Sequence, residues 1–170
     1  MLYYYRNHYN IEIITKRGEC VTAIELLNKY DIRPSGLRIK ILEYILSHKT
    51  HPTVDEIYES LIKDNPTLSR TTVYNTTKVL GDKGLVKVIT IDGQQVRFDG
   101  DIFLHGHFRC KVCGKIYDFD VLEQPNIPLE GFAVDNTDIY CVGSCKNCNS
   151  NKKFIKGKGA IMMKKFVCPV

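Results

Sequence analysis

Two C-x-x-C pairs constrain this chain more than any other feature of its sequence. Cys110 and Cys113 form the first pair, and Cys145 and Cys148 form the second. Each tight turn can present two thiolates, so the two turns together supply the four sulfur ligands of a tetrahedral zinc site. Such a closed site leaves no position for water. The sequence therefore predicts a structural zinc that supplies folding free energy to a small domain.

The other cysteines leave alternatives open. Cys141 lies just before the second pair and could replace Cys145 as a ligand, whereas Cys20 and Cys168 are expected to be unliganded. A redox C-x-x-C motif is the rival interpretation, although it needs no second pair. Metal-binding cysteines are more typical of a reducing compartment than disulfides are, so we expect a cytoplasmic protein.

Length and composition limit the number of domains and the class of protein. The 170 residues suffice for one ordinary domain or two small ones, and 44% hydrophobic with 25% charged residues is typical of a globular protein. The apolar runs fall far short of the ~20 residues of a membrane helix, and the N-terminus lacks the layout of a secretory signal. The net charge of +5 permits an anionic partner without proving one, because lysines after Asp138 inflate it.

Residues 22–98 have the pattern of several helices followed by a hairpin. The predicted helix signals are an apolar segment from Ala23 to Tyr30, a cap at Ser35, a capping box of Thr53 and Glu56, a cap at Ser69 and a left-handed terminator at Gly84. Residues 85–91 and 94–98 are strand-like, and Asp92-Gly93 between them suits a tight type I′ turn. This order is typical of a winged helix, a helix-turn-helix variant.

Short strands around the cysteine turns are expected from about residue 105 onward. The candidate strands are residues 104–110, 115–120, 131–134 and 138–142. The fold class is therefore α+β, with an N-terminal winged-helix DNA-binding domain and a small C-terminal β-rich domain. The expected boundaries are 22–98 for the first domain, 99–104 for a hinge and 105–156 for the second domain, with extensions at 1–21 and 157–170.

The helix after Ser69 carries a polar face suited to DNA. With Val73, Thr77 and Leu80 turned toward a core, the opposite side presents Thr71, Tyr74, Asn75 and Lys78, with Arg70 at its flank. Such side chains can hydrogen-bond base edges and neutralise phosphates, although an ordinary solvated face is the alternative. Arg33 and Arg38, beside the preceding helix, could hold the DNA backbone or enter a minor groove. Structural salt bridges are equally consistent with both arginines.

Histidines and carboxylates form a second candidate metal site. His105 and His107 share one face of a strand because side chains alternate. Asp118 lies on the next strand, Asp99 ends the hairpin, and His51 precedes Pro52. Nitrogen and oxygen donors without a thiolate suit Fe(II) or Mn(II), and zinc would also bind them. A metallohydrolase or oxygenase is an alternative, but five ligands leave little room for substrate and no general base is evident, so we expect a non-enzyme.

The chain resembles the ferric uptake regulator family, and most closely its peroxide-sensing branch, the PerR repressors. The resemblance runs from about Ala23 to Cys148 and includes HPTVDEIY (51–58), TLSRTTVYNT (67–76), RFDGD (97–101) and HGHFRCKVCGKIYDF (105–119). It implies a homodimer, joined through the C-terminal domain, that binds an AT-rich inverted-repeat operator in double-stranded DNA. Cys110, Cys113, Cys145 and Cys148 match its zinc ligands, and Tyr74 matches a base-contacting tyrosine. The regulatory Fe(II) or Mn(II) ligands match His51, Asp99, His105, His107 and Asp118.

The branch follows from a few of these positions. The iron-sensing branch usually has a glutamate in place of Asp99, and zinc-sensing relatives use a thiolate in the regulatory site. The resemblance therefore implies a repressor that senses hydrogen peroxide when bound Fe(II) promotes oxidation of His51 or His105. Iron sensing without peroxide chemistry is the alternative, and a zinc-stabilised DNA-binding module without a switch is a third.

Three segments depart from the family pattern. Residues 121–130 carry two prolines where relatives have a dimerisation helix, and proline disfavours that helix. Val21 could be an alternative start. Residues 163–170 are similar to the beginning of a rubredoxin, so a truncated rubredoxin fusion or reading into neighbouring sequence is an alternative to a native end. Cys168 alone cannot form the iron site of a rubredoxin.

Overall fold

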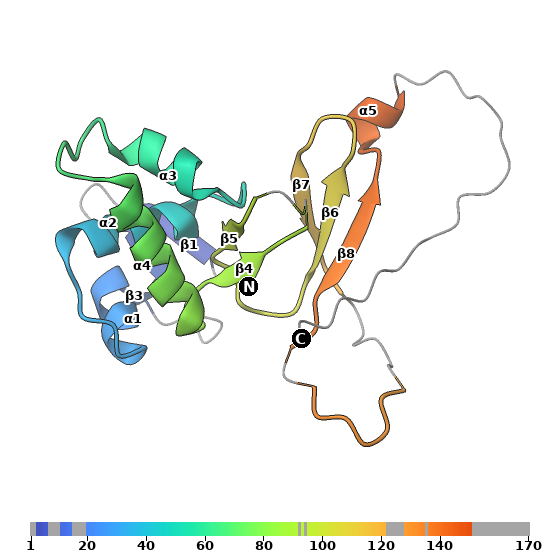
Figure 1. Ribbon diagram of the computed structural model, residues 1–170, viewed down its shortest axis with the longest axis horizontal. Helices are drawn as coiled ribbons and strands as arrows, with labels where there is room; N and C mark the ends of the chain where they lie inside the picture. Colours follow the sequence, from blue (N-terminus) through green and yellow to red (C-terminus); the bar gives the residue numbers. More distant parts are fainter. Residues whose placement is uncertain are drawn as a thin grey trace, which may run out of the picture. The chain divides into compact units, whose positions relative to one another are not determined.

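The computed structural model describes residues 3–6, 11–14, 20–91, 93, 95–121, 128–134 and 136–150. The chain divides into two compact units, residues 1–103 and 104–170. The expected α+β class is confirmed, since the first unit is mainly helical and the second is built on a sheet (Figure 1). Within the described part of the chain, no helix is both long enough and apolar enough to cross a membrane.

The first unit contains the helices α1 (Ala23–Lys29), α2 (Gly36–Ser47), α3 (Val54–Leu61) and α4 (Arg70–Asp82). Each helix follows a Ser or Thr whose side-chain oxygen accepts a hydrogen bond from a backbone N–H of the first turn. The predicted caps at Ser35, Thr53 and Ser69 are confirmed, and Gly84 follows α4 with a φ of 69°. The capping box of Thr22 and Glu25 at α1 was not predicted.

Helices α1, α2, α3 and α4 together enclose the core of the first unit. Its fully buried side chains include Ile41 and Leu42 of α2, Ile57 of α3, and Val73 and Leu80 of α4. Burying each such side chain contributes about 1.5–3 kcal/mol relative to leaving it in water. Because Val73 and Leu80 occupy the inward face of α4, its opposite face is turned to solvent.

The wing is a two-stranded antiparallel hairpin of β4 (Lys87–Ile89) and β5 (Arg97–Asp99). A two-residue turn at Asp92-Gly93 would pair Ile89 with Val96, whereas the structure pairs Ile89 with Arg97. The predicted tight turn is therefore wrong by one residue in register. Gly93, at φ 67°, donates its N–H to the carbonyl of Thr90 across 3.1 Å, which fits a longer loop with one left-handed glycine. Asp92 lies outside the described residues.

An N-terminal sheet precedes the helices and was not predicted. It contains β1 (Tyr3–Arg6), β2 (Ile11–Ile14) and β3 (Cys20–Val21), paired in that order and antiparallel. The segment 1–21, expected only as an extension, thus contains regular secondary structure. The extension 157–170 lies outside the described residues.

The second unit is built on a three-stranded sheet in the order β7-β6-β8. Its central strand β6 (Gly106–Cys110) pairs antiparallel with β7 (Ile116–Phe119) and parallel with β8 (Ile139–Gly143), and the short helix α5 (Lys146–Ser150) follows. The strand predicted at 131–134 is wrong. Gly131 has a φ of 82° and Phe132 is 74% exposed, so this segment turns outside the sheet. Residues 122–127, within the proline-containing segment, lie outside the described residues.

Candidate metal centres and DNA-reading face

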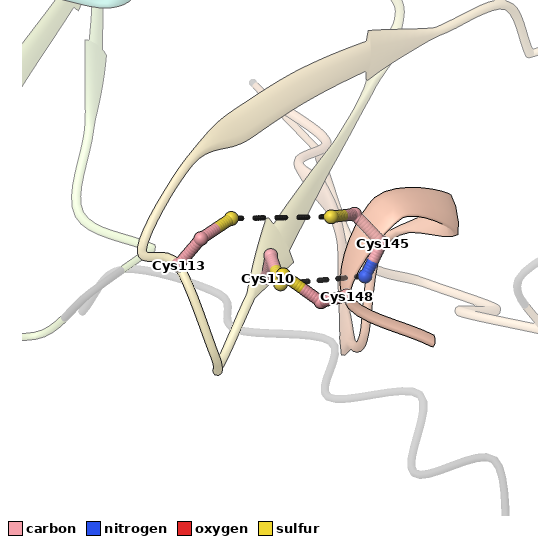
Figure 2. Close-up of side chains that lie close together, drawn as sticks. All are labelled: Cys110, Cys113, Cys145 and Cys148. Atoms are coloured by element: carbon pink, nitrogen blue, oxygen red, sulfur yellow. Dashed lines mark hydrogen bonds between the residues drawn. The ribbon is translucent and has the colours of Figure 1, made fainter. Parts of the chain in front are cut away.

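The four predicted zinc ligands converge at one end of the sheet (Figure 2). Cys110 ends β6, Cys113 lies in the following turn, and Cys145 and Cys148 lie before and within α5. The four sulfurs lie within 4.8 Å of one another, and those of Cys113 and Cys145 are 3.9 Å apart. A tetrahedral zinc with Zn–S bonds of about 2.3 Å would hold its sulfurs about 3.8 Å apart. The donor set therefore fits structural zinc.

Backbone N–H groups around the two turns favour thiolates. Hydrogen bonds from the backbone at Cys113 and Cys145 lower the pKa of Cys110 to about 6, and the N–H of Cys145 is 3.3 Å from that sulfur. The backbone at Cys148 lowers the pKa of Cys145, whereas the thiol of Cys148, hydrogen-bonded to the Cys145 sulfur, has its pKa raised to about 12. Four close thiolates repel one another, so full ionisation of this cluster requires a dication.

The alternative ligand Cys141 does not join this cluster. It lies on β8, paired with Phe108 of β6, and the four-sulfur group of the described chain contains Cys145 instead. The Tyr117 hydroxyl adds a contact that the sequence did not predict. Its hydrogen bond to Cys145 raises the pKa of Tyr117 to about 12. Cys168 lies outside the described residues.

His51 and Asp99 form a donor pair in the first unit. Nε2 of His51 lies 3.8 Å from Oδ2 of Asp99, and the two residues are 1% and 6% exposed. His51 stands in the turn between α2 and α3, and Asp99 ends β5. The other carboxylate oxygen of Asp99 accepts the N–H of Asp101 across 2.9 Å. This hydrogen bond orients the carboxylate.

His105, His107 and Asp118 form a second donor group, in the second unit. The Nε2 atoms of His105 and His107 are 3.0 Å apart, and Oδ1 of Asp118 lies 4.0 and 3.9 Å from them. Asp118 pairs with His107 in the register of β6 and β7, so both side chains leave the sheet on one face. Two nitrogens at about 2.1 Å from one octahedral ion would lie about 3.0 Å apart, so the pair fits a metal.

The two kinds of centre differ in donor chemistry. The cysteine cluster offers soft thiolates, which suit zinc, whereas the second set offers imidazole and carboxylate, which suit Fe(II) or Mn(II). The cofactors expected from the sequence therefore agree with the donors that the fold assembles: a structural Zn²⁺ and a regulatory Fe²⁺ or Mn²⁺.

Helix α4 presents the predicted polar face to solvent. Thr71, Tyr74, Asn75 and Lys78 are all exposed, and Tyr74 is 57% exposed. Thr77, on the opposite side, is fully buried. A large aromatic ring left in water at the centre of a polar helix face is available for contact with a partner.

The four predicted cationic DNA-binding residues differ in their surroundings. Arg70 donates to Asp55 of α3 across 2.8 Å, and Lys78 pairs with Asp82 across 2.6 Å. Arg38 donates to the carbonyl of Arg33 across 2.8 Å, which closes the turn before α2. Arg38 also borders a hollow of about 380 Å³ between α2 and α4, lined by Ser35, Leu37, Thr72, Asn75, Thr76 and Val79.

Sequence reasoning missed one residue beside the first donor pair. Arg97 donates to the carbonyl oxygen of His51 across 3.0 Å. The contact joins residues 46 positions apart. Only the pairing of the turn at His51 with the wing strand brings them together, so no local sequence signal could have revealed it.

Comparisons with known proteins agree with this architecture. A "Peroxide-responsive repressor PerR" from Staphylococcus aureus strain Mu50 is 36% identical over 144 residues, covering 82% of this chain and 97% of that protein. The solved ferric uptake regulator from Pseudomonas aeruginosa with manganese has a TM-score of 0.63 at 22% identity and covers 74% of this chain and 99% of its own. The ferric uptake regulator Fur of Helicobacter pylori has a TM-score of 0.60 at 20% identity, covering 76% and 95%.

These two solved structures support the fold, a winged-helix domain followed by a small β-rich domain. The model of the ferric uptake regulator family matches residues 29–140, which include α2, α3, α4, the wing and strands β6 and β7, and which reach the start of β8. The chain therefore belongs to the ferric uptake regulator family of metal-dependent transcriptional repressors.

Proposed function

We propose that this protein is a cytoplasmic, homodimeric repressor that senses hydrogen peroxide through metal-catalysed oxidation of a histidine. The observation that carries the proposal is the regulatory donor set: imidazoles and aspartates, with no thiolate among them. The similarity to a protein named a peroxide-responsive repressor supports the same branch. The role is regulation of transcription rather than enzymatic turnover.

The regulatory metal joins the two units in this proposal. His51 and Asp99 come from the first unit, and His105, His107 and Asp118 come from the second. If all five bind one ion, the ion fixes how the DNA-binding unit is held in each subunit. In a two-fold dimer this orientation sets the spacing of the two α4 helices, which must enter grooves about 34 Å or a multiple of it apart. Metal and DNA binding are then coupled, typically by about 1–3 kcal/mol.

Oxidation removes one ligand from this set. A bound Fe(II) ion would activate hydrogen peroxide beside the ligands by lending one electron that the imidazole returns, so that peroxide is the net two-electron oxidant. The imidazole of His51 or His105 gains one oxygen atom, and water is the other product. An oxidised imidazole is a poor donor, so the link between the units is lost and the repressor leaves its operator. Mn(II) would hold the same orientation with little oxidation.

The exposed face of α4 reads the operator, an AT-rich inverted repeat. Tyr74 and Asn75 contact base edges, Thr71 and Lys78 contact the DNA beside them, and Arg70 supports this face from its flank. The remaining contacts, from Arg33 and Arg38, hold the phosphate backbone near the start of α2. The zinc at the four cysteines stabilises the second unit, through which the dimer forms.

Peptide mass spectrometry tests the oxidation directly. Trypsin releases residues 50–63, whose single histidine is His51, and residues 98–109, which contain His105 and His107. Treating the Fe(II)-loaded protein with peroxide should add one oxygen at His51 or His105 and abolish operator binding. The Mn(II)-loaded protein should keep both histidines unmodified and should still bind the operator. The peptide 41–49 contains the exposed His48 and serves as an internal control that should stay unmodified.

The opposite result identifies the alternative. If peroxide leaves every histidine unmodified while DNA binding still depends on Fe(II), the protein is an iron-sensing repressor. If the gel shift does not respond to Fe(II) or Mn(II) at all, it is a zinc-stabilised DNA-binding module without a switch.

A further inference from the structure

The backbone of His51 adopts a conformation that requires support. Its φ is 52°, in the left-handed region that non-glycine residues seldom enter. Such a conformation is strained and persists only where the surrounding structure holds it. The side chain of His51 is buried, so the direction of its imidazole depends on this backbone conformation.

Strand β5 of the wing supplies that support. Nη1 of Arg97 donates to the carbonyl of His51 across 3.0 Å, and the N–H of Phe98 donates to the carbonyl of Pro52 across 3.0 Å. Thr53 forms an isolated antiparallel bridge with Arg97. The same strand then ends at Asp99, whose carboxylate faces the His51 ring at 3.8 Å. One short strand thus fixes the backbone of His51 and places the acid beside its ring.

Arg97 also links this turn to helix α3. Its guanidinium lies 3.3 Å from Oε2 of Glu56, and the same oxygen accepts the N–H of Thr53 across 2.8 Å at the start of α3. The Arg97 side chain is only 18% exposed, so these contacts are partly shielded from water. The same nitrogen, Nη1 of Arg97, makes the contacts with the carboxylate of Glu56 and with the carbonyl of His51.

We propose that Arg97 is a positioning residue for the regulatory site, which holds the turn of His51 against the wing and thereby couples the wing to metal binding. This inference rests on the proposed role of His51 as a metal ligand. Because the wing of a winged helix lies next to DNA, a DNA contact that stabilises β5 would stabilise His51 in its metal-binding position as well.

A double-mutant cycle between Arg97→Met and His51→Ala tests the proposal. Mn(II) affinity is measured by calorimetry on the zinc-loaded full chain, and zinc content and melting temperature are recorded for each variant. Arg97→Met should weaken Mn(II) binding by about tenfold, the lower range for supporting residues around a metal ligand. In the His51→Ala background the same substitution should change Mn(II) affinity by less than about twofold, because the residue that Arg97 positions is gone.

Glu56→Gln is the matched control. It removes the charge beside Arg97 but leaves the hydrogen bond to His51, so Mn(II) affinity should stay within about twofold of wild type. The Mn(II) affinity of Arg97→Lys, which keeps the positive charge, should lie between the affinities of wild type and Arg97→Met. Arg97→Lys takes the place of Arg97→Met in the cycle if the Arg97→Met protein loses its zinc. The proposal would be overturned if Arg97→Met lowered Mn(II) affinity equally in the wild-type and His51→Ala backgrounds. It would also be overturned if Arg97→Met and Arg97→Lys both bound Mn(II) with wild-type affinity.

Histidine NMR of the zinc-loaded protein without regulatory metal separates this inference from the proposed function. Substituting Arg97 should shift the ring signals of His51 and leave those of His105 and His107 in place. A shift at His51 in a protein that does not bind Mn(II) would reject the regulatory site but keep the positioning role. Binding of Mn(II) through His51 with unshifted His51 signals would reject the positioning role alone.

Discussion

The guanidinium of Arg70, at the start of α4, donates to Asp55 of α3 across 2.8 Å and lies 4.4 Å from the centre of the Tyr58 ring. Its Nη2 is also 3.9 Å from Glu59 of α3. The hydrogen bond to Asp55 raises the pKa of Arg70. These partners all lie on α3, so Arg70 orients the two helices of the helix-turn-helix relative to each other.

We therefore expect Arg70→Ala to leave the salt dependence of operator binding unchanged. A residue that neutralises a phosphate lowers the slope of log K against log salt by about 1, and the charge of Arg70 is already matched within the protein. Fluorescence anisotropy over a salt series measures the slope. Arg38→Ala is the comparison, and it should lower the slope by about 1 per subunit. A similar decrease for Arg70→Ala would place that side chain on the DNA backbone instead.

Tyr74 and Asn75 should determine sequence specificity. Asn75→Ala should weaken operator binding by about 1–3 kcal/mol and reduce discrimination between base pairs, because a lost base contact relaxes specificity at its position. Both residues are exposed, so the melting temperature should hardly change. Binding to operators with single base-pair changes measures the effect. Lys83→Ala, at the far end of α4, is the control, and equal losses for Lys83→Ala and Asn75→Ala would contradict this reading face.

A side chain at Gly106 would displace the ring of Phe119, because this ring occupies the space where a Cβ would stand. The two residues pair across β6 and β7, and Gly106 separates the donors His105 and His107. Gly106→Ala should destabilise the second unit by about 1–3 kcal/mol through overpacking and should weaken Mn(II) binding. Thermal unfolding and calorimetry measure the two effects.

A second substitution makes this test specific. Adding Phe119→Leu to Gly106→Ala replaces the ring with a smaller side chain and should recover part of the lost Mn(II) affinity. Gly36→Ala serves as a control because a Cβ there meets no atom within 4 Å. Wild-type Mn(II) affinity in Gly106→Ala would show that the packing of Phe119 does not fix the two histidines.

Cys145 should be essential for zinc, and Cys141 should not be. Cys145→Ser removes one of four sulfurs that lie within 4.8 Å of one another, so the protein should lose its zinc and the second unit should unfold. Cys141→Ser should retain one zinc per chain. Zinc analysis after gel filtration, together with circular dichroism, measures both outcomes. A zinc-free Cys141→Ser protein would reassign the fourth ligand.

The sequence predicted those features that depend on local signals. Caps at Ser35, Thr53 and Ser69 mark helix starts because their side chains satisfy nearby N–H groups, and the apolar spacing of Val73 and Leu80 identified the buried face of α4. Paired cysteines likewise indicate a metal through their spacing alone.

Features that depend on pairing between distant segments were missed. The wing register differs from the prediction because an Asp-Gly pair forms a two-residue turn only where the flanking strands pair in the matching register. The apolar residues 131–134 suggested a strand, but nothing in their own sequence reveals whether a partner strand is present. The hydrogen bond from Arg97 to His51 likewise depends on the tertiary fold.

Strand β6 makes the two metal centres of this protein depend on each other. It carries His107 near one end and Cys110 at the other, so a single strand contributes to both metal centres. A reagent that oxidises the cysteines or extracts their zinc would loosen β6 and disturb the histidines. Operator release would then follow without any oxidised imidazole. Thiol damage would thus imitate the proposed peroxide signal, but it would leave the histidine peptides unmodified and would be reversed by re-reduction and zinc reloading.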